Sequence, residues 1–159
     1  MISFFKKKPI LTLHAITKGQ VVALADVNDP TFSQKMMGEG VAIIPEDGQI
    51  VAPCDGTLTM VFPTLHAFGM STDSGAEILV HVGLNTVNLK GEGFTLHAEA
   101  NQSVKKGDLI LEVDLEKIKG AGYDPITPIV ICNSSSFSKV IPILPSYVNQ
   151  GDTIIDIMK

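Results

Sequence analysis

The sequence of 159 residues has no tryptophan, only two cysteines and no long apolar run. Two cysteines without CxxC spacing are too few for a disulfide framework or a four-ligand zinc site, so we expect Cys54 and Cys132 to be buried, reduced thiols. No run approaches the roughly 18 apolar residues that span a bilayer, and residues 1–9 contain no apolar core of signal-peptide length. These absences predict a cytoplasmic protein that is neither exported nor membrane-spanning.

Positive charge is also scarce. The net charge is -5 at pH 7, the pI is about 5.2, and the only basic tract is Lys6 to Lys8. This balance argues against nucleic acid as the principal partner and suits a basic protein partner. Phe4 and Phe5 precede the basic tract. We expect residues 1–9 to form a flexible tail with at most weak contact to an anionic membrane surface.

The remaining residues, 10–159, have the composition of one folded domain. The hydrophobic content of 45% and the mean hydropathy of +0.27 allow a sizeable core. From Ile10 onward, short β-type segments alternate with Gly, Pro, Asp and Asn, which is typical of an antiparallel β-sandwich or barrel. The expected fold class is therefore all-β.

Helix is expected in only two short segments. At residues 29–38, Asp29 can cap a helix, Pro30 suits its first position and Gly38 can end it. Three apolar residues would then share one side of this helix, either as core or as a docking surface: Phe32, Met36 and Met37. A second helical turn is expected around residues 115–119.

A short internal repeat occurs around Gly19, Gly107 and Gly151. The last two copies share a Val-x-x-Gly-Asp pattern and align at an offset of 44 residues, from 107 to 151. Each glycine is expected to make a tight turn, so the predicted repeating unit is a β-hairpin. Similar turns occur in biotinyl and lipoyl carriers, which makes a swinging-arm carrier an alternative. However, no lysine with the flanking residues of those carriers lies at a hairpin tip.

Two of the four histidines lie in neighbouring apolar segments separated by a turn. Alternation over residues 62–70 and 77–81 predicts two strands of a hairpin. A two-residue loop would place His66 opposite His81, whereas a three-residue loop ending on Gly75 would shift the register by about one residue. Either loop makes the imidazoles neighbours, while the face that each occupies stays open.

Two neighbouring imidazoles allow four interpretations: a metal pair, a general base with its partner, a nucleophile with a hydrogen-bond donor, or packed histidines without a chemical role. Neutral imidazole can attack a phosphoryl group if its other nitrogen is held by an acceptor. A zinc hydrolase is a poorer fit, because the sequence offers no His-x-His pair and only Glu77 or Asp73 as helpers. No role is expected for His14 or His97, which lie in other segments.

Three blocks of sequence carry a family resemblance. Residues 64–68 (Thr-Leu-His-Ala-Phe), 74–87 (with Leu-Val-His-Val-Gly at its centre) and 89–94 (Leu-Lys-Gly-Glu-Gly-Phe) resemble the active-site block of the glucose-family enzyme IIA of the bacterial sugar phosphotransferase system. Residues 19–56 and 104–133 are similar to the same family, so the resemblance covers nearly the whole chain. It implies a phosphotransferase that carries a phosphoryl group transiently on a histidine, without a cofactor or metal.

The resemblance also implies roles for individual residues. His81 would accept the phosphoryl group on Nε2, while the Gly83 carbonyl holds its Nδ1. His66 would donate to the phosphoryl oxygens, with the Thr64 hydroxyl orienting it. The face that meets partners would include Phe32, Met36, Met37, Phe62 and Asn85. The family usually has Asp at the position of Asn85, so this substitution changes the charge around the site.

Two protein partners follow from the resemblance. The histidine-containing phosphocarrier protein would supply the phosphoryl group, and a cysteine of the IIB domain of a sugar permease would accept it. Regulatory protein targets are also implied, since this family often signals sugar status through its phosphorylation. A regulatory binding module without transfer activity is the remaining alternative, and it predicts that no phosphohistidine forms. The chain has no Gly-rich phosphate loop, which agrees with a phosphoprotein donor rather than ATP.

Overall fold

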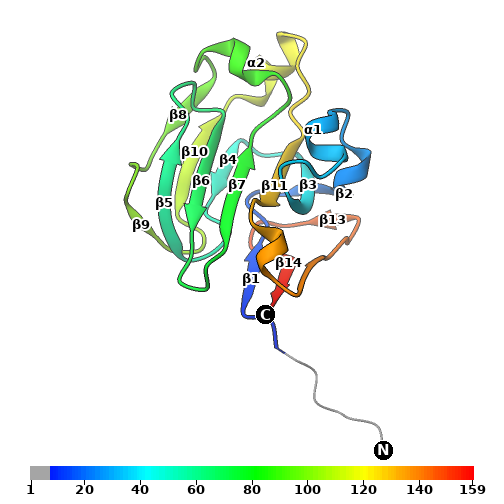
Figure 1. Ribbon diagram of the computed structural model, residues 1–159. Coiled ribbons are helices and arrows are strands. Elements are labelled where there is room, and N and C mark those ends of the chain that lie inside the picture. Colours follow the sequence, from blue (N-terminus) through cyan, green and yellow to red (C-terminus); the bar gives the residue numbers. More distant parts are fainter. Residues whose placement is uncertain (1–7) are drawn as a thin grey trace, which may run out of the picture.

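A computed structural model of the chain describes residues 8–159. The strands in this range pair in antiparallel fashion and form three sheets (Figure 1). This confirms the expected all-β class. The proposed membrane contact through Phe4 and Phe5 lies outside the described residues. Within residues 8–159, no helix is long and apolar enough to cross a membrane.

The largest sheet has eight strands, in the order β13-β2-β3-β11-β7-β6-β5-β9. These strands are Tyr147–Val148 (β13), Gly19–Ala23 (β2), Glu39–Pro45 (β3), Thr127–Ile131 (β11), Glu77–His81 (β7), Ala67–Ser71 (β6), Gly56–Val61 (β5) and Ser103–Val104 (β9). Each of the two smaller sheets has three strands. One contains β1 (Leu11–His14), β14 (Thr153–Met158) and β12 (Lys139–Pro142), and the other contains β4 (Gln49–Val51), β10 (Leu109–Val113) and β8 (Phe94–Leu96).

The centre of the large sheet is buried on both faces. Along β7, Ile78 and Val80 face a core that is shared by all three sheets, while Leu79 faces a smaller apolar cluster. Because side chains alternate along a strand, His81 continues the face of Leu79. The smaller cluster also contains Phe32, which brings the 29–38 segment next to the end of β7 (Figure 1).

The helices are short, as predicted. The α1 helix covers Pro30–Ser33, and the Asp29 carboxylate caps it by accepting a hydrogen bond from the Thr31 N–H at 3.0 Å. The helix ends well before Gly38, because Lys35 takes the left-handed conformation with φ +58°. The α2 helix covers Leu115–Gly120 and confirms the second expected segment. Single 3-10 turns occur at Leu24–Asp26 (η1), Thr86–Leu89 (η2) and Ser134–Ser136 (η3).

The repeated glycines serve a different purpose from the one expected. Gly107 and Gly151 do make tight turns, with φ +88° and +93°. The strands that flank each turn do not pair with each other: β9 joins β5 while β10 joins β4 and β8, and β13 joins β2 while β14 joins β1 and β12. In place of repeated hairpins, each turn therefore carries the chain from one sheet to another. Gly19 lies within β2, where a Cβ atom would approach the Ile44 carbonyl oxygen to 2.1 Å.

The two cysteines differ in exposure. Cys54 is buried, with 3% of its surface exposed, and burial raises the pKa of its thiol to about 12. Cys132 is exposed, so the expectation that both thiols are buried is wrong for this residue. It follows the last residue of β11, where its N–H still donates to the Glu77 carbonyl at 2.8 Å but its side chain has passed the edge of the core.

Candidate functional site

The two histidines meet at the open end of the β6–β7 hairpin. Ala67 pairs with His81, and at the other end the Thr72 N–H donates to the Ala76 carbonyl at 3.1 Å. The loop therefore has three residues and ends on Gly75, whose φ is +89°. Of the two loops considered from the sequence, the structure adopts the longer one, and His66 does not lie directly opposite His81.

The strand expected over residues 62–70 is shorter than predicted. Strand β5 ends at Val61 and β6 begins at Ala67, with a turn between them in which the Leu65 N–H donates to the Phe62 carbonyl at 2.8 Å. Leu65 has φ +60°, which L-residues rarely adopt. Because of this kink, His66 lies before strand β6 and does not follow the alternation of side chains along it. Its ring therefore turns toward His81, although Ala67 is the residue paired with His81.

Four aromatic rings form a row across the site. The ring centroids of His66 and His81 are 4.9 Å apart, with an interplanar angle of 85°. The ring centroids of Phe32 and His81 are 5.1 Å apart. Phe62 packs edge-on against His66, with ring centroids 5.4 Å apart. The two phenylalanines limit the positions that the imidazoles can take.

His81 is held by the backbone of its own loop. Its Nδ1 donates a hydrogen bond to the Gly83 carbonyl at 2.7 Å. A carbonyl can only accept, so the neutral ring carries its proton on Nδ1 and keeps a lone pair on Nε2. Gly83 has φ +80°, which turns this carbonyl back toward the ring. The Gly83 carbonyl is thus the hydrogen-bond partner of His81 Nδ1.

His66 has a side-chain partner instead. It is 3% exposed, and its Nδ1 lies 2.7 Å from the Thr64 hydroxyl. When the hydroxyl donates to Nδ1, the proton of the neutral ring is on Nε2, where it can serve as a donor. Thr64 and His66 are therefore placed to supply one N–H beside His81.

Both imidazoles are neutral at pH 7. Burial lowers the pKa of His81, while the Gly83 hydrogen bond and the Asp29 carboxylate act in the opposite direction. Burial, with a smaller contribution from His81, lowers the pKa of His66 to about 4. Asp29 was expected only as a helix cap, and its electrostatic influence on His81 could not be read from its position in the sequence.

The residues expected to meet partners separate into two groups. Phe32 is 3% exposed and belongs to the interior, whereas Met36 is 70% exposed and Met37 is 38% exposed. They do not share one side of a helix, because the helix ends before Met36. Phe62 is half-buried against His66, and Asn85 is exposed with φ +61°, a conformation that Asn tolerates better than most residues.

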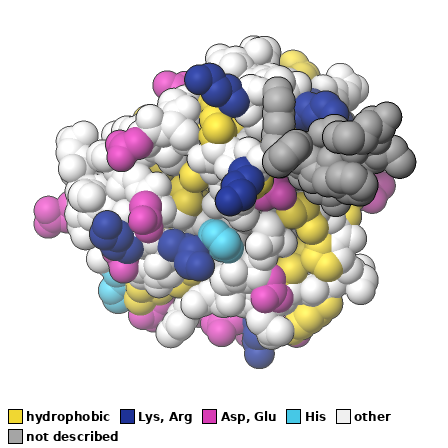
Figure 2. Space-filling model, turned by 90° about the horizontal axis from the view of Figure 1, so that it is seen from below, with side chains coloured by type: hydrophobic (Ala, Val, Ile, Leu, Met, Phe, Trp, Pro, Cys, Tyr) yellow, Lys and Arg dark blue, Asp and Glu magenta, His cyan; other side chains and the backbone are white. Residues whose placement is uncertain are grey.

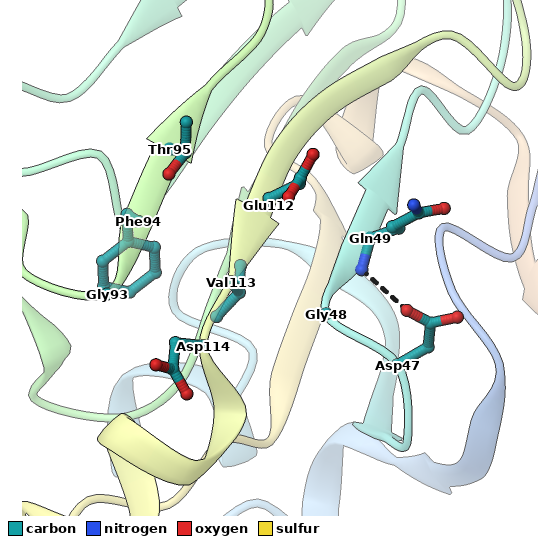
Figure 3. A pocket seen from close by; sticks show the side chains of 9 residues that line it. All are labelled: Asp47, Gly48, Gln49, Gly93, Phe94, Thr95, Glu112, Val113 and Asp114. Atoms are coloured by element: carbon teal, nitrogen blue, oxygen red, sulfur yellow. Dashed lines mark hydrogen bonds between the residues drawn. The ribbon is translucent and has the colours of Figure 1, made fainter.

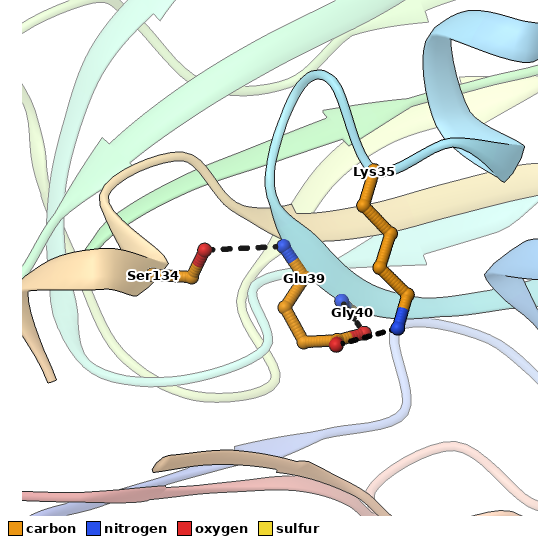
Figure 4. Close-up of polar contacts among 4 residues, drawn as sticks. All are labelled: Lys35, Glu39, Gly40 and Ser134. Atoms are coloured by element: carbon orange, nitrogen blue, oxygen red, sulfur yellow. Dashed lines mark hydrogen bonds and ion pairs between the residues drawn. The ribbon is translucent and has the colours of Figure 1, made fainter. Parts of the chain in front are cut away.

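The turn that carries Met36 and Met37 is anchored by polar contacts (Figure 4). The Lys35 ammonium lies 2.9 Å from one carboxylate oxygen of Glu39, and the other oxygen accepts from the Gly40 N–H at 3.1 Å. The Glu39 N–H donates to the Ser134 hydroxyl at 3.3 Å. These contacts tie the exposed methionines to strand β3.

The two site histidines do not line the hollow shown in Figure 3. This hollow, of about 440 Å³, lies over β4, β8 and β10. Its polar groups have partners: Asp47 accepts from the Gln49 N–H at 3.0 Å, and Glu112 pairs with His97 at 2.9 Å. This hollow is therefore separate from the histidine site.

The remaining alternatives from the sequence find little support. Within residues 8–159, no group of three or more His, Cys, Asp and Glu side chains is arranged to hold a metal ion, so a zinc hydrolase lacks its third ligand. The hairpin tip between β6 and β7 contains no lysine for a swinging arm. His14, whose Nδ1 is 3.1 Å from the Gly151 carbonyl, and His97 lie outside the site.

Comparison with known proteins identifies the family. The model of the phosphoenolpyruvate-dependent sugar phosphotransferase system, EIIA 1 family matches residues 11–137. The chain belongs to this family. The β-glucoside-specific EIIBCA component of the phosphotransferase system of Bacillus subtilis (strain 168) is 48% identical over 126 residues, which are 79% of this chain and 21% of that protein. The chain thus spans about a fifth of the length of this relative.

The fold of an EIIA domain is confirmed by a solved structure. Glucose permease IIA from Mycoplasma capricolum superposes with a TM-score of 0.85 and 37% identity, over 97% of this chain and 98% of that one. EIIA domains are phosphotransferase components that carry phosphoryl groups on histidine. The family predicted from the sequence is therefore confirmed, together with its class of activity.

Sequence reasoning missed the residues that form hydrogen bonds with the backbone of residues 82–84, directly after His81. Thr86 is fully buried and donates to the Val82 carbonyl at 2.5 Å. The carbonyls of Asp124 and Ile126 accept from Leu84 and Gly83, at 2.9 and 3.0 Å. These acceptors come from the backbone of a distant segment, so no residue pattern could have indicated them. For Thr86, the only signal in the sequence was its position within residues 74–87, the block that carries the family resemblance.

Proposed function

We propose that His81 is the phosphoryl acceptor of this EIIA domain and that the histidine-containing phosphocarrier protein is the donor. The observation that carries this proposal is the hydrogen bond from His81 Nδ1 to the Gly83 carbonyl at 2.7 Å. It leaves the Nε2 lone pair available in a half-buried ring that is neutral at pH 7. A nucleophile of this kind needs no base to remove a proton.

The proposed reaction is an in-line exchange between nucleophiles. The Nε2 lone pair forms a bond to phosphorus while the bond from phosphorus to the donor's histidine nitrogen breaks. His81 keeps its Nδ1 proton throughout, so the phosphorylated ring is cationic and is stabilised by the Gly83 carbonyl. In the second transfer a cysteine thiolate of the IIB domain attacks phosphorus, and neutral His81 leaves.

His66 is proposed to stabilise the charge on the transferring group. The Thr64 hydroxyl, 2.7 Å from Nδ1, favours the tautomer whose proton is on Nε2. With ring centroids 4.9 Å apart, a phosphoryl group on His81 lies within reach of this donor. A fixed donor in a site from which a partner excludes water is worth more than the same donor in bulk solvent.

The partners and location are also part of the proposal. We propose that partners contact Met36, Met37, Phe62 and Asn85. Phe62 packs against His66, while the two methionines, in the turn after α1, and Asn85, four residues after His81, are exposed. The acceptor would be the IIB domain of a sugar permease, and regulatory targets would bind the same face. We place the protein in the cytoplasm, where both phosphoryl carriers act. The β-glucoside specificity belongs to the Bacillus relative and does not define the sugar here.

The decisive experiment combines the protein with phosphoenolpyruvate and the upstream phosphocarriers. The expected product is one acid-labile, base-stable phosphate per chain, mapped to His81 by mass spectrometry under alkaline conditions. His81→Gln should abolish it, whereas His14→Gln and His97→Gln serve as matched controls and should be phosphorylated normally. Phosphate on His66 with His81 unmodified would refute the assignment. Stable binding to the phosphocarrier without any phosphohistidine would favour a purely regulatory module.

A further inference from the structure

Two successive peptide units after His81 are anchored at all of their polar atoms. In the unit between Val82 and Gly83, the carbonyl accepts from the Thr86 hydroxyl at 2.5 Å and the N–H donates to the Ile126 carbonyl at 3.0 Å. In the unit between Gly83 and Leu84, the carbonyl accepts from His81 Nδ1 at 2.7 Å. The Leu84 N–H donates to the Asp124 carbonyl at 2.9 Å. The direction of the Gly83 carbonyl is thus determined by its neighbours.

Apart from the His81 ring itself, Thr86 is the only side chain of the described residues that hydrogen-bonds these two peptide units, and it does so as a donor. The two acceptors, the carbonyls of Ile126 and Asp124, belong to the backbone, so a substitution cannot remove them. Thr86 is 0% exposed, so water cannot replace its hydroxyl without a change in packing. Its methyl group also fills the space beside Gly83, where a Cβ atom would lie 2.5 Å from Thr86 Cγ2. Thr86 therefore fixes the orientation of the Val82–Gly83 peptide through its hydroxyl and fills the space beside Gly83 with its methyl group.

We infer that Thr86 is a positioning residue for phosphoryl transfer: its hydroxyl fixes the Val82–Gly83 peptide, so that the next carbonyl keeps the His81 proton on Nδ1. Thr86 does not touch the transferring group and acts through Gly83. Without its hydroxyl, the Val82 carbonyl loses its partner, the loop relaxes and part of the His81 population moves its proton to Nε2. That fraction has no lone pair where the phosphoryl group arrives.

The test compares Thr86→Val with Thr86→Ser. Thr86→Val keeps the shape of the side chain but removes the donor, whereas Thr86→Ser keeps the donor and removes the methyl group. The first readout is the tautomer of His81 in the protein without partners, measured from the ¹⁵N shifts and two-bond couplings of the imidazole. We expect Nδ1–H in the wild type and in Thr86→Ser, and a measurable Nε2–H population in Thr86→Val.

The second readout is the rate of phosphoryl transfer from the phosphocarrier to His81. Small displacements at a reacting centre cost up to about 100-fold in rate, and we expect Thr86→Val to be roughly 10-fold slower than the wild type. Thr17→Val is the matched control, because Thr17 is also 0% exposed and its hydroxyl donates to a backbone carbonyl, that of Asp47, at 2.9 Å. It should change neither the tautomer nor the rate.

Each outcome supports or overturns the inference. If Thr86→Val matches Thr17→Val in tautomer and rate, Thr86 has only a structural role and the inference is wrong. If Thr86→Val does not fold, Thr86→Ser and Thr86→Ala, which differ by the hydroxyl alone, carry the comparison, and equal tautomers would overturn it. The rate readout depends on the proposed function, but the tautomer readout does not. A wild-type protein that takes no phosphate on His81 would refute that function and leave the test of Thr86 intact.

Discussion

His66 and His81 face each other at a centroid distance of 4.9 Å although they are not cross-strand partners. The pairing register places Ala67, not His66, opposite His81. The rings meet because His66 precedes β6 and follows Leu65, whose left-handed backbone turns the chain. The relation between the two imidazoles therefore depends on a backbone kink as well as on the sheet.

The first prediction concerns the roles of the two rings. His66→Gln should leave phosphorylation of His81 measurable and slow the onward transfer to a IIB domain by roughly 100-fold, since removing one fixed donor commonly costs about that much in rate. Thr64→Val should act in the same direction but more weakly, because it changes only the orientation and tautomer of His66. Rapid-quench measurements of both half-reactions test this. Equal losses in the two directions would contradict the division of labour.

The second prediction concerns acid stability. The pKa of each site histidine is lower in the folded protein than the value near 6.5 of the unfolded chain, and for His66 it is about 4. Below pH 6.5 these histidines become protonated in the unfolded chain but stay neutral in the folded protein. Their contribution to the free energy of unfolding is therefore fully present above pH 6.5 and falls as the pH drops toward 4. One such histidine contributes a slope of about 1.4 kcal/mol per pH unit between these two values.

Urea unfolding between pH 7 and pH 4 provides the measurement. His66→Gln removes one of these titrations, so its stability should fall less steeply with pH than that of the wild type. Carboxylates contribute equally to both proteins and cancel in the difference. Parallel curves for the two proteins would show that His66 is protonated as readily in the folded state as in the unfolded one.

The third prediction concerns docking. Met36 is 70% exposed in the turn that follows α1, so Met36→Lys should leave the fold intact and slow transfer from the phosphocarrier by roughly 10-fold, because an ammonium replaces an apolar contact of the proposed docking face. Leu144→Lys is the control, since Leu144 is 52% exposed but lies between β12 and β13. Circular dichroism establishes folding, and transfer kinetics establish docking. Normal kinetics for Met36→Lys would exclude this residue from the interface.

Phe32 provides a contrast within the same segment. At 3% exposed and in contact with the His81 ring, it cannot accept a charge without loss of packing. Phe32→Lys should therefore unfold the protein, while Phe32→Ala should cost about 3 to 5 kcal/mol. An intact Phe32→Lys protein would mean that the α1 segment detaches from the sheet readily.

The fourth prediction concerns Asn85, where the family resemblance leads us to expect Asp. Asn85 is exposed and its φ of +61° is accessible to Asp as well, so Asn85→Asp should fold normally. The new carboxylate should strengthen binding to a basic phosphocarrier by up to about 1 kcal/mol at low salt, and this gain should vanish at high salt. Isothermal titration calorimetry at two ionic strengths tests it. A dissociation constant that is unchanged at both would place Asn85 outside the contact.

The sequence predicted the all-β class, the capped helix start at Asp29 and the proximity of the two histidines. It succeeded because each depends on local signals: alternation of apolar residues, turn residues and a cap followed by proline. The family resemblance then indicated the partners of the imidazoles, Thr64 and Gly83, which lie within two residues of them in the chain and at hydrogen-bond distance in the structure.

Features that depend on distant contacts could not be predicted. The Val-x-x-Gly-Asp turns look like hairpin turns, but where a strand finds its partner is decided by the whole sheet, and β9 and β10 pair elsewhere. Pro63 lies at the second position of the turn from Phe62 to Leu65, where proline is favoured, but no residue preference predicts the left-handed backbone of Leu65 itself. The end of α1 at Ser33 and the exposure of Cys132 likewise depend on where the chain leaves the core.

The three-residue tip of the β6–β7 hairpin has a consequence for how this family can vary. The tip lies at the far end of five-residue strands, roughly 13 to 17 Å along the hairpin from the histidines. Deleting Asp73 or Ser74 leaves two residues between Thr72 and Ala76, and two-residue loops are the commonest hairpin connections, so the pairing of Ala67 with His81 can be kept. The tip can therefore lose a residue without turning the face of β7 that carries His81, and a change of loop length there should leave the proposed phosphoryl site in place.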